Sequence, residues 1–313
     1  MRINVVIPAY RPDEKLIHLV SMLKKQTVSV SKVIIMHTLT ADADRYRKVI
    51  DELDFDAVEV HDLSVDEFDH GKTRNEGVSY TEKDCDIVIL MTQDAVPYDE
   101  RLVEELVKPF SEEKTGATYG RQMADENSTL AEKFTRNFNY PDEDRVKTLA
   151  DIETIGIKAF FCSNVCAAYR MTVFRELGGF VNRAIFNEDM IYANKLLKSG
   201  YDIAYASKAR VIHTHDYSGK QQYKRNFDLA VSQAMNPQAF EGISSESEGV
   251  RYVKAAFKYF AQNKKPLKII PFGINCVYKY LGYRKGKNYK NLSMKKIMKC
   301  TSNPGFWKLE EGK

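Results

Sequence analysis

The stretch from Asp86 to Pro97, DIVILMTQDAVP, places the apolar run IVILM directly before Thr92, Gln93 and Asp94. An uninterrupted apolar run of this kind is typical of a strand that is buried on both faces, as in parallel sheets. The strand nevertheless ends on a carboxylate. A carboxylate at the carboxyl end of a central strand can hold a divalent cation, and it can equally cap a turn or the following helix.

Similar apolar segments precede this strand, at residues 3–8, 32–37 and 57–62, and stretches with helical spacing separate them. This alternation predicts an α/β fold, with a mostly parallel twisted sheet flanked by helices on both faces. Such sheets bind ligands beyond the carboxyl ends of their strands. One rim of the sheet should therefore carry Pro8, Ala9, Tyr10, Asp62, Gln93 and Asp94.

The second half of the chain is less regular. We expect strands near residues 117–123 and 163–171, a helix over 187–200 with Asn187 as its N-cap, and two short strands at 202–206 and 209–215. From Gly219 onward the pattern is helical and basic. The chain is therefore predicted to have two parts, residues 1–220 and a helical extension over residues 221–313.

Charge divides the chain in a similar way. Residues 251–313 contain 16 Lys and Arg against 2 Asp and Glu, whereas residues 1–250 contain 31 basic and 41 acidic residues. Basic residues mixed with Ile, Phe, Tyr and Leu suit a segment that lies on an anionic membrane surface. Nucleic-acid binding, and packing of a basic helical face on the acidic part of the chain, are the alternatives.

The five cysteines form an odd set without CxxC pairs, so neither a disulfide framework nor a zinc site is indicated. The first residues, MRINVVIPAY, resemble a strand followed by a proline and not a signal peptide. No apolar run is long enough for a membrane-spanning helix. We therefore expect a cytoplasmic chain that lies peripherally on the membrane if it contacts one.

The segment FDHGKTRNEG, residues 68–77, gathers His70, Lys72 and Arg74 at the start of a predicted helix. The free N–H groups of a helix start favour an anion, which predicts a phosphate-binding role, and a solvated basic turn is the alternative. The segment matches neither the P-loop pattern nor the dinucleotide-binding glycine pattern.

Two further groups can carry chemistry. Glu188 and Asp189 are adjacent acids in the first turn of a predicted helix, where the helix dipole accounts for one acid and the other could serve as a general base. His213 and His215 lie two residues apart at a strand end and hence on one face. Together with Asp94 they are candidate metal ligands, although a single strand-end histidine is usually structural.

In this order, the motifs resemble family 2 glycosyltransferases of the GT-A fold, in particular bacterial rhamnosyltransferases that build cell-wall and capsular polysaccharides. The resemblance covers roughly residues 1 to 220, and the segments that carry it are VVIPAY, HGKTRNEG, LMTQDA, FFCSNVCAAYR, GGF, NEDM and VIHTHDYS.

The resemblance implies a role for each residue type. Asp189 would be the catalytic base, supported by Glu188, and Asp94 would contact Mg²⁺ or Mn²⁺ with His213 or His215 completing the metal site. The nucleotide sugar would be bound by Pro8, Ala9, Tyr10, Asp62, Lys72, Arg74, Gln93 and Asp94.

Two features depart from the family pattern. The second strand ends in MHTLT, residues 36–40, where the family has an acidic motif that touches the nucleobase, and Asp62 on the next strand is a possible substitute. Gln93 leaves Asp94 as the only acid at the position of the family's DxD motif. With fewer protein charges, the metal should depend more on the nucleotide diphosphate for its ligands.

The implied reaction is inverting transfer of a sugar, with dTDP-L-rhamnose as the expected donor and a saccharide, typically lipid-linked in such enzymes, as the acceptor. The alternatives are another donor, such as a UDP-sugar, and a non-catalytic GT-A scaffold that only binds. An anionic membrane surface is the expected further partner of the basic region, and no nucleic acid is expected.

Overall fold

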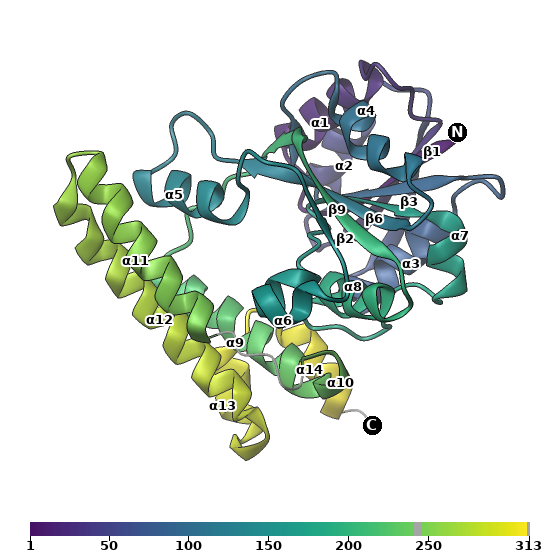
Figure 1. Cartoon of the computed structure of the whole chain (residues 1–313). Coiled ribbons are helices and arrows are strands. Elements are labelled where there is room, and N and C mark those ends of the chain that lie inside the picture. The colour runs from purple at the N-terminus through teal and green to yellow at the C-terminus, as the bar shows by residue number, and fades with distance from the viewer. Residues whose placement is uncertain (241–245, 312–313) are drawn as a thin grey trace.

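The computed structural model describes residues 1–240 and 246–311, and a nine-stranded sheet forms the centre of the molecule (Figure 1). Eight strands follow the order β3-β2-β1-β4-β8-β6-β9-β5, and β7 pairs with β9. The strands are β1 Ile3–Tyr10, β2 Lys32–Leu39, β3 Val58–Ser64, β4 Ile87–Met91, β5 Val96–Pro97, β6 Thr115–Met123, β7 Arg145–Lys147, β8 Cys166–Arg170 and β9 Asp202–Ile212.

The sheet is mostly parallel, as predicted. Strands β3, β2, β1 and β4 run parallel, β8 is antiparallel to both of its neighbours, and β6 and β9 run parallel to each other. The predicted pair of short strands at 202–206 and 209–215 is wrong, because β9 is one continuous strand. The pairing register shifts between Gly120 and Arg121 on β6, opposite residues 207–209, and this irregularity resembled a turn in the sequence.

Helices cover both faces of the sheet and bury two separate apolar layers. Alternation along β1 explains the division, since Val5 and Ile7 belong to the layer under α1, and Val6 belongs to the layer under α3. The helices of the first 200 residues are α1 Glu14–Lys24, α2 Ala43–Asp51, α3 His70–Ser79, α4 Leu102–Val107, α5 Leu130–Asn139, α6 Asp151–Ile155, α7 Met171–Glu176 and α8 Glu188–Lys198.

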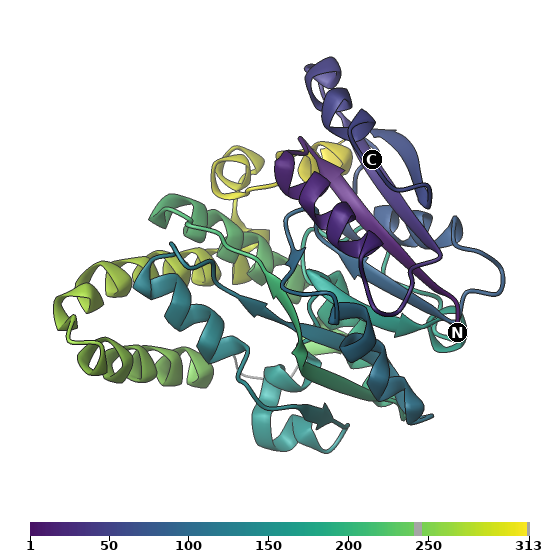
Figure 2. The same ribbon diagram turned by 90° about the horizontal axis from the view of Figure 1, so that it is seen from above.

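The part of the chain after β9 is helical, as predicted, over its described residues. Its helices are α9 Gly219–Met235, α10 Pro237–Phe240, α11 Glu246–Gln262, α12 Ile269–Lys287, α13 Met294–Cys300 and α14 Pro304–Glu311. Helices α11 and α12 form a hairpin that projects to one side of the sheet (Figures 1 and 2). The division of the chain into domains at residue 220 stays a prediction.

Helix α12 packs very closely on α9. Gly282 and Gly286 lie against the backbone of α9, and a Cβ atom at either position would collide with the carbonyl oxygen of Tyr223 or Phe227. This contact needs glycine because two helix backbones can approach so closely only where no side chain lies between them. No helix in the described residues is both long and apolar enough to cross a membrane.

Candidate active site

The ends of β1 and β4 are tied together by Gln93. Its side-chain oxygen accepts a hydrogen bond from the Tyr10 backbone N–H (2.8 Å), and its side-chain nitrogen donates to the Tyr10 carbonyl (2.9 Å). An aspartate cannot donate the second bond, which gives a structural reason for an amide at position 93. Tyr10 is exposed beside it, whereas the Ala9 side chain is buried in the core, and Pro8 is partly exposed.

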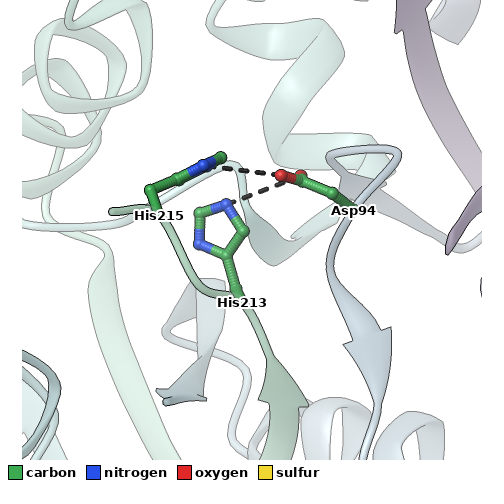
Figure 3. Close-up of side chains that lie close together, drawn as sticks. All are labelled: Asp94, His213 and His215. Carbon is green, nitrogen blue, oxygen red and sulfur yellow. Dashed lines mark ion pairs between the residues drawn. The ribbon is translucent and has the colours of Figure 1, made fainter. Parts of the chain in front are cut away.

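Asp94, His213 and His215 come together at this rim (Figure 3). Asp94 follows β4, and the two histidines follow β9. The distances from the carboxylate oxygens of Asp94 to Nε2 are 3.5 Å for His213 and 3.3 Å for His215. Their potential ligand atoms all lie within 4.8 Å of one another, as binding of a single cation requires.

Gln122 on β6 orients His213. Nδ1 of His213 lies 2.9 Å from Oε1 of Gln122, and because this oxygen only accepts, Nδ1 carries the proton and Nε2 keeps its lone pair toward Asp94. Gln122 is held in turn by Arg136, which donates to the same oxygen, and by the Ser163 hydroxyl, which accepts from its amide nitrogen. A hydrogen bond of this kind behind a histidine is typical of metal sites.

The charge states of these three side chains at neutral pH also favour binding of a cation. Burial alone would raise the pKa of Asp94, but His213 and His215 beside the carboxylate hold the pKa well below its usual range. Burial, and then the neighbouring His213, lowers the pKa of His215 to about 4, and burial lowers the pKa of His213. One carboxylate and two neutral imidazoles are therefore available, a donor set that fits a divalent metal.

Glu188 and Asp189 begin α8 but occupy different environments. The buried Glu188 carboxylate lies 3.2 Å from the Arg74 guanidinium and accepts a hydrogen bond from the side-chain amide of Asn164 (3.1 Å). Burial alone would raise the pKa of Glu188, but the charge of Arg74, the nearby His70 and the hydrogen bond from Asn164 together hold the pKa below its usual value. Glu188 is thus a fixed anion.

Asp189 is only partly buried and has a raised pKa. Its carboxylate accepts hydrogen bonds from the backbone N–H groups of Asn164 (3.2 Å) and Met190 (2.7 Å). Burial, and then the charge of Glu188, raises the pKa of Asp189 to about 7. A carboxylate that titrates near neutrality can accept and release a proton at physiological pH, whereas Glu188 cannot.

Asn164 is a site residue that the sequence analysis missed, although it lies within the quoted segment FFCSNVCAAYR. Its side chain donates to Glu188, its backbone donates to Asp189, and its side-chain oxygen accepts from the Tyr169 hydroxyl (2.7 Å). Ser163, next to it, contacts Gln122 behind His213. Residues 163–164 therefore connect the candidate base to the candidate metal site. The signal that the sequence offered was a polar asparagine within a mainly apolar segment.

Two residues of the segment FDHGKTRNEG form hydrogen bonds to the loop at residues 180–184, which precedes α8. Asp69 caps α3 and also accepts hydrogen bonds from the backbone N–H groups of Arg183 (3.1 Å) and Ala184 (2.8 Å). Asn75 exchanges two hydrogen bonds with the Phe180 backbone, just after Gly178 and Gly179, which both have positive φ. These contacts fix the loop that leads to Glu188 and Asp189.

Arg74 and Lys72 face different surroundings. Arg74 is buried against Glu188, whereas the sequence analysis expected its guanidinium to face the nucleotide. Direct contact between Arg74 and the nucleotide stays a prediction. Lys72 is exposed and lines a surface pocket together with Asp62 and Asn75. The two cations that the sequence grouped together therefore serve different parts of the rim.

An acid does lie beside the end of β2, and the neighbouring strand β3 supplies it. Asp62 on β3 pairs in register with His37 on β2, and its carboxylate accepts from His37 Nδ1 (2.9 Å) and from Arg47 (2.8 Å). Nε2 of the buried His37 has no hydrogen-bond partner among the described residues. The sequence analysis missed His37.

Arg225 on α9 is a further cation near the metal candidates. Its guanidinium lies over the rings of Tyr217 (4.6 Å) and Phe186 (5.3 Å), and Tyr217 in turn stacks on His215 (4.8 Å). None of the carboxylates in the described part of the chain forms an ion pair with Arg225. The sequence analysis missed this residue because it lies in the basic extension, beyond the matched motifs.

Comparison with known proteins identifies the family of this chain. Residues 1–231 match the family model described as glycosyltransferase like family 2. The chain is 33% identical over 310 residues to the O-antigen chain rhamnosyltransferase RfbN of Salmonella typhimurium, covering 98% of this chain and 96% of that protein. It is 36% identical over 248 residues to the O-antigen chain rhamnosyltransferase WbaN of Salmonella anatum, covering 78% of each.

Solved structures show the same fold at low sequence identity. The mannosyltransferase PcManGT from Pyrobaculum calidifontis, in complex with GDP-Man and Mn²⁺, has a TM-score of 0.55 at 13% identity, over 99% of this chain and 79% of that chain. S. aureus TarS in complex with UDP-GlcNAc has a TM-score of 0.51 at 13% identity, over 93% and 92% of the two chains.

The chain belongs to glycosyltransferase family 2, and it has the GT-A fold. The predicted family, fold class and enzyme class are thereby confirmed. The family model extends beyond the predicted boundary at residue 220 and covers most of α9, the helix that carries Arg225.

Proposed function

We propose that this glycosyltransferase transfers L-rhamnose from dTDP-L-rhamnose, with inversion, to a saccharide acceptor in polysaccharide synthesis. Two relatives at 33% and 36% identity carry the name O-antigen chain rhamnosyltransferase, which supports the choice of sugar. The observation that carries the reaction type is the connection through residues 163–164, which joins a base titrating near neutrality to a metal-binding cluster.

In the proposed reaction, Asp189 accepts the proton of the acceptor hydroxyl while that oxygen attacks the anomeric carbon. Glu188 remains ionised beside it, and its charge keeps the pKa of Asp189 high. Arg74 neutralises Glu188 and fixes its position. The pairing of these three residues therefore prepares one carboxylate for proton transfer.

On the donor side, Asp94, His213 and His215 would hold Mg²⁺ or Mn²⁺, which supplies charge neutralisation to the departing diphosphate. We propose that Arg225 contacts the same diphosphate, since no carboxylate of the described residues pairs with its charge and two rings fix its position. Tyr10 and the backbone of Pro8 and Ala9 would line the nucleotide pocket. Asp62 with His37, and the exposed Lys72, would contact the nucleotide beyond them.

A donor screen tests this assignment. The purified protein is incubated with dTDP-L-rhamnose, GDP-sugars and UDP-sugars, each with Mg²⁺ or Mn²⁺, and release of the nucleoside diphosphate is measured with and without a saccharide acceptor. We expect dTDP-L-rhamnose to give the fastest release. Faster release from a UDP-sugar would replace the proposed donor, and no release from any donor would favour the scaffold alternative.

The rate of transfer should depend on pH with the sign set by Asp189. The carboxylate must be deprotonated to act as a base, so kcat should rise with pH and level off above the raised pKa of about 7. Below it, kcat should fall about tenfold per pH unit. The measurement is a kcat–pH profile at saturating donor and metal. A profile that stays flat from neutral to mildly acid pH would contradict Asp189 as the base.

Replacing Arg225 with glutamine should weaken the diphosphate contact selectively. We expect kcat/KM for the donor to fall roughly 10- to 100-fold, the range of a lost hydrogen bond to a charged group. Calorimetry should show weaker binding of dTDP and unchanged binding of thymidine. Lys224→Gln, the neighbouring change of the same charge, is the matched control. Equal losses for dTDP and thymidine would show that Arg225 does not read the diphosphate.

The proposed acceptor is lipid-linked, and the basic region is proposed to bring the enzyme to the cytoplasmic surface of an anionic membrane. Residues 251–313 carry 16 Lys and Arg against 2 Asp and Glu, which supports attraction to such a surface. A protein that lies on the membrane can reach the sugar end of an acceptor whose lipid is embedded there.

A further inference from the structure

We propose that the α11–α12 hairpin inserts an apolar face into an anionic lipid bilayer. The proposal deepens the membrane contact proposed above and rests on it. Large apolar side chains on the hairpin are solvent-exposed in the structure, with Phe257 at 61% and Leu267 at 78% of their surface. We call the following set the hairpin stripe: Val250, Val253, Phe257, Leu267, Ile270, Ile274, Val277 and Leu281.

The stripe has a helical period on both helices. On α11 its members are spaced i, i+3 and i+7, and on α12 they are spaced i, i+4, i+7 and i+11, so each set lies along one side of its helix. Exposed large apolar side chains are concentrated on these two helices, whereas elsewhere on the described surface they are scattered. Exposed apolar side chains gathered along a helix in this way usually mark an interaction site.

The fold buries one side of each helix. Ala256 and Phe260 of α11, and Phe272 of α12, are buried in a cluster with Phe134 of α5. By helical spacing, Ile270 lies about 160° from Phe272, on the opposite side of α12, whereas Phe257 lies about 100° from Ala256 and about 60° from Phe260. The exposed apolar side chains therefore form a separate face on α12 and the solvent-exposed border of the buried side on α11.

Charge around the stripe indicates an anionic bilayer. The sequence contains no Asp or Glu from Gly249 to Leu309, and exposed lysines flank the stripe on α11 and on the link between the two helices. These lysines are Lys254, Lys258, Lys264, Lys265 and Lys268. Lysine stems can lie along apolar surface while the ammonium groups reach lipid phosphates. A second copy of the chain would present the same positive charge, which opposes pairing through this face.

We expect the α11–α12 hairpin to enter the bilayer only to a shallow depth. Neither α11 nor α12 can span a bilayer, since no described helix is long and apolar enough. An amphipathic helix with a basic flank lies in the plane of the interface and buries its apolar side at the boundary between headgroups and acyl chains. The hairpin would thus lie on one leaflet, with the stripe below the phosphates and the lysines beside them.

Vesicle flotation tests the apolar contribution. The full-length protein is mixed with vesicles of phosphatidylcholine alone, or of phosphatidylcholine and phosphatidylglycerol in equal parts. We expect flotation with the anionic vesicles. The triple variant Phe257→Ser, Ile270→Ser, Val277→Ser should partition at least about tenfold more weakly, because three apolar side chains no longer enter lipid. All three side chains are exposed, so the fold should persist.

A matched triple variant, Val65→Ser, Val146→Ser, Leu149→Ser, removes apolar side chains that are about half exposed elsewhere on the surface and should float like the parent. Equal flotation of the stripe variant and the parent would overturn insertion and leave a purely electrostatic contact. Flotation lost equally in both triple variants, or a concentration-dependent dimer that the stripe variant abolishes, would also overturn the proposal.

Fluorescence gives a second readout that is independent of catalysis. The only tryptophan, Trp307, is 3% exposed, so Phe257→Trp adds a separate surface probe. Its emission should shift to shorter wavelength with anionic vesicles and be quenched by brominated acyl chains, whereas Leu149→Trp should show neither effect. An unchanged Phe257→Trp spectrum would overturn insertion. The donor screen in solution reports separately on the proposed transferase activity.

Discussion

Replacing Asp189 with asparagine should lower kcat for transfer by about 10²- to 10⁴-fold, the usual contribution of a positioned base. Asparagine has nearly the same shape, and its side-chain oxygen can keep one hydrogen bond from the backbone N–H of Asn164 or Met190. It cannot accept the proton of the acceptor hydroxyl. We therefore expect dTDP binding, measured by calorimetry, to stay close to the parent value while transfer is lost.

Glu188→Gln is the informative comparison. Glu188 is buried against Arg74, so its loss leaves a buried guanidinium without its partner and should lower the free energy of unfolding as well as activity. Asp189→Asn, by contrast, should unfold at a temperature close to that of the parent. Transfer by Asp189→Asn at the parent rate would exclude this residue as the base.

Replacing Asp94 with asparagine should remove the only protein charge from the candidate metal site. His213 and His215 would remain as neutral ligands, because burial keeps their pKa values low. Loss of a neighbour that only orients a metal ligand typically costs 10- to 100-fold in metal affinity or activity. We expect the loss of a charged ligand to be at least about 100-fold, measured as the Mn²⁺ concentration needed for half-maximal nucleoside diphosphate release.

Asp54→Asn provides a control with the same chemistry at a remote position, because the Asp54 side chain is 95% exposed and pairs only with Lys24 in the described structure. Its Mn²⁺ dependence should match that of the parent. An unchanged metal requirement in Asp94→Asn, or full activity of the parent protein with a chelator present, would reject a metal role for Asp94.

The sheet could be predicted because strands buried on both faces have an uninterrupted apolar sequence. Strand β4, with all five residues buried, is the clearest case. Strand β9 was divided wrongly because Ser207 and Lys208 are polar and interrupt its apolar pattern. In the structure, the Ser207 backbone and hydroxyl both donate to Asp144 (2.7 Å), and this contact with a residue 63 positions away satisfies the irregular backbone.

The sequence predicted where the site residues lie better than it predicted which residues they contact. Asp94, His213 and His215 could be grouped because strand ends of one sheet meet at a common rim. The partner of Arg74 could not be predicted, since a buried cation requires an anion but one sequence does not identify which of the distant acids supplies it. Asp69 shows the same limit, because its hydrogen bond to Ala184 spans 115 positions.

On the proposed membrane contact, the glycine contact between α12 and α9 would give the enzyme a fixed geometry. Gly282 and Gly286 allow α12 to touch the α9 backbone at Tyr223 and Phe227, on either side of Arg225 in the sequence. A hairpin resting in lipid would therefore hold the reaction centre at a constant height above the bilayer. Only an acceptor of matching length could place its terminal sugar there, so the enzyme would act as a molecular ruler and sense how far the growing chain extends.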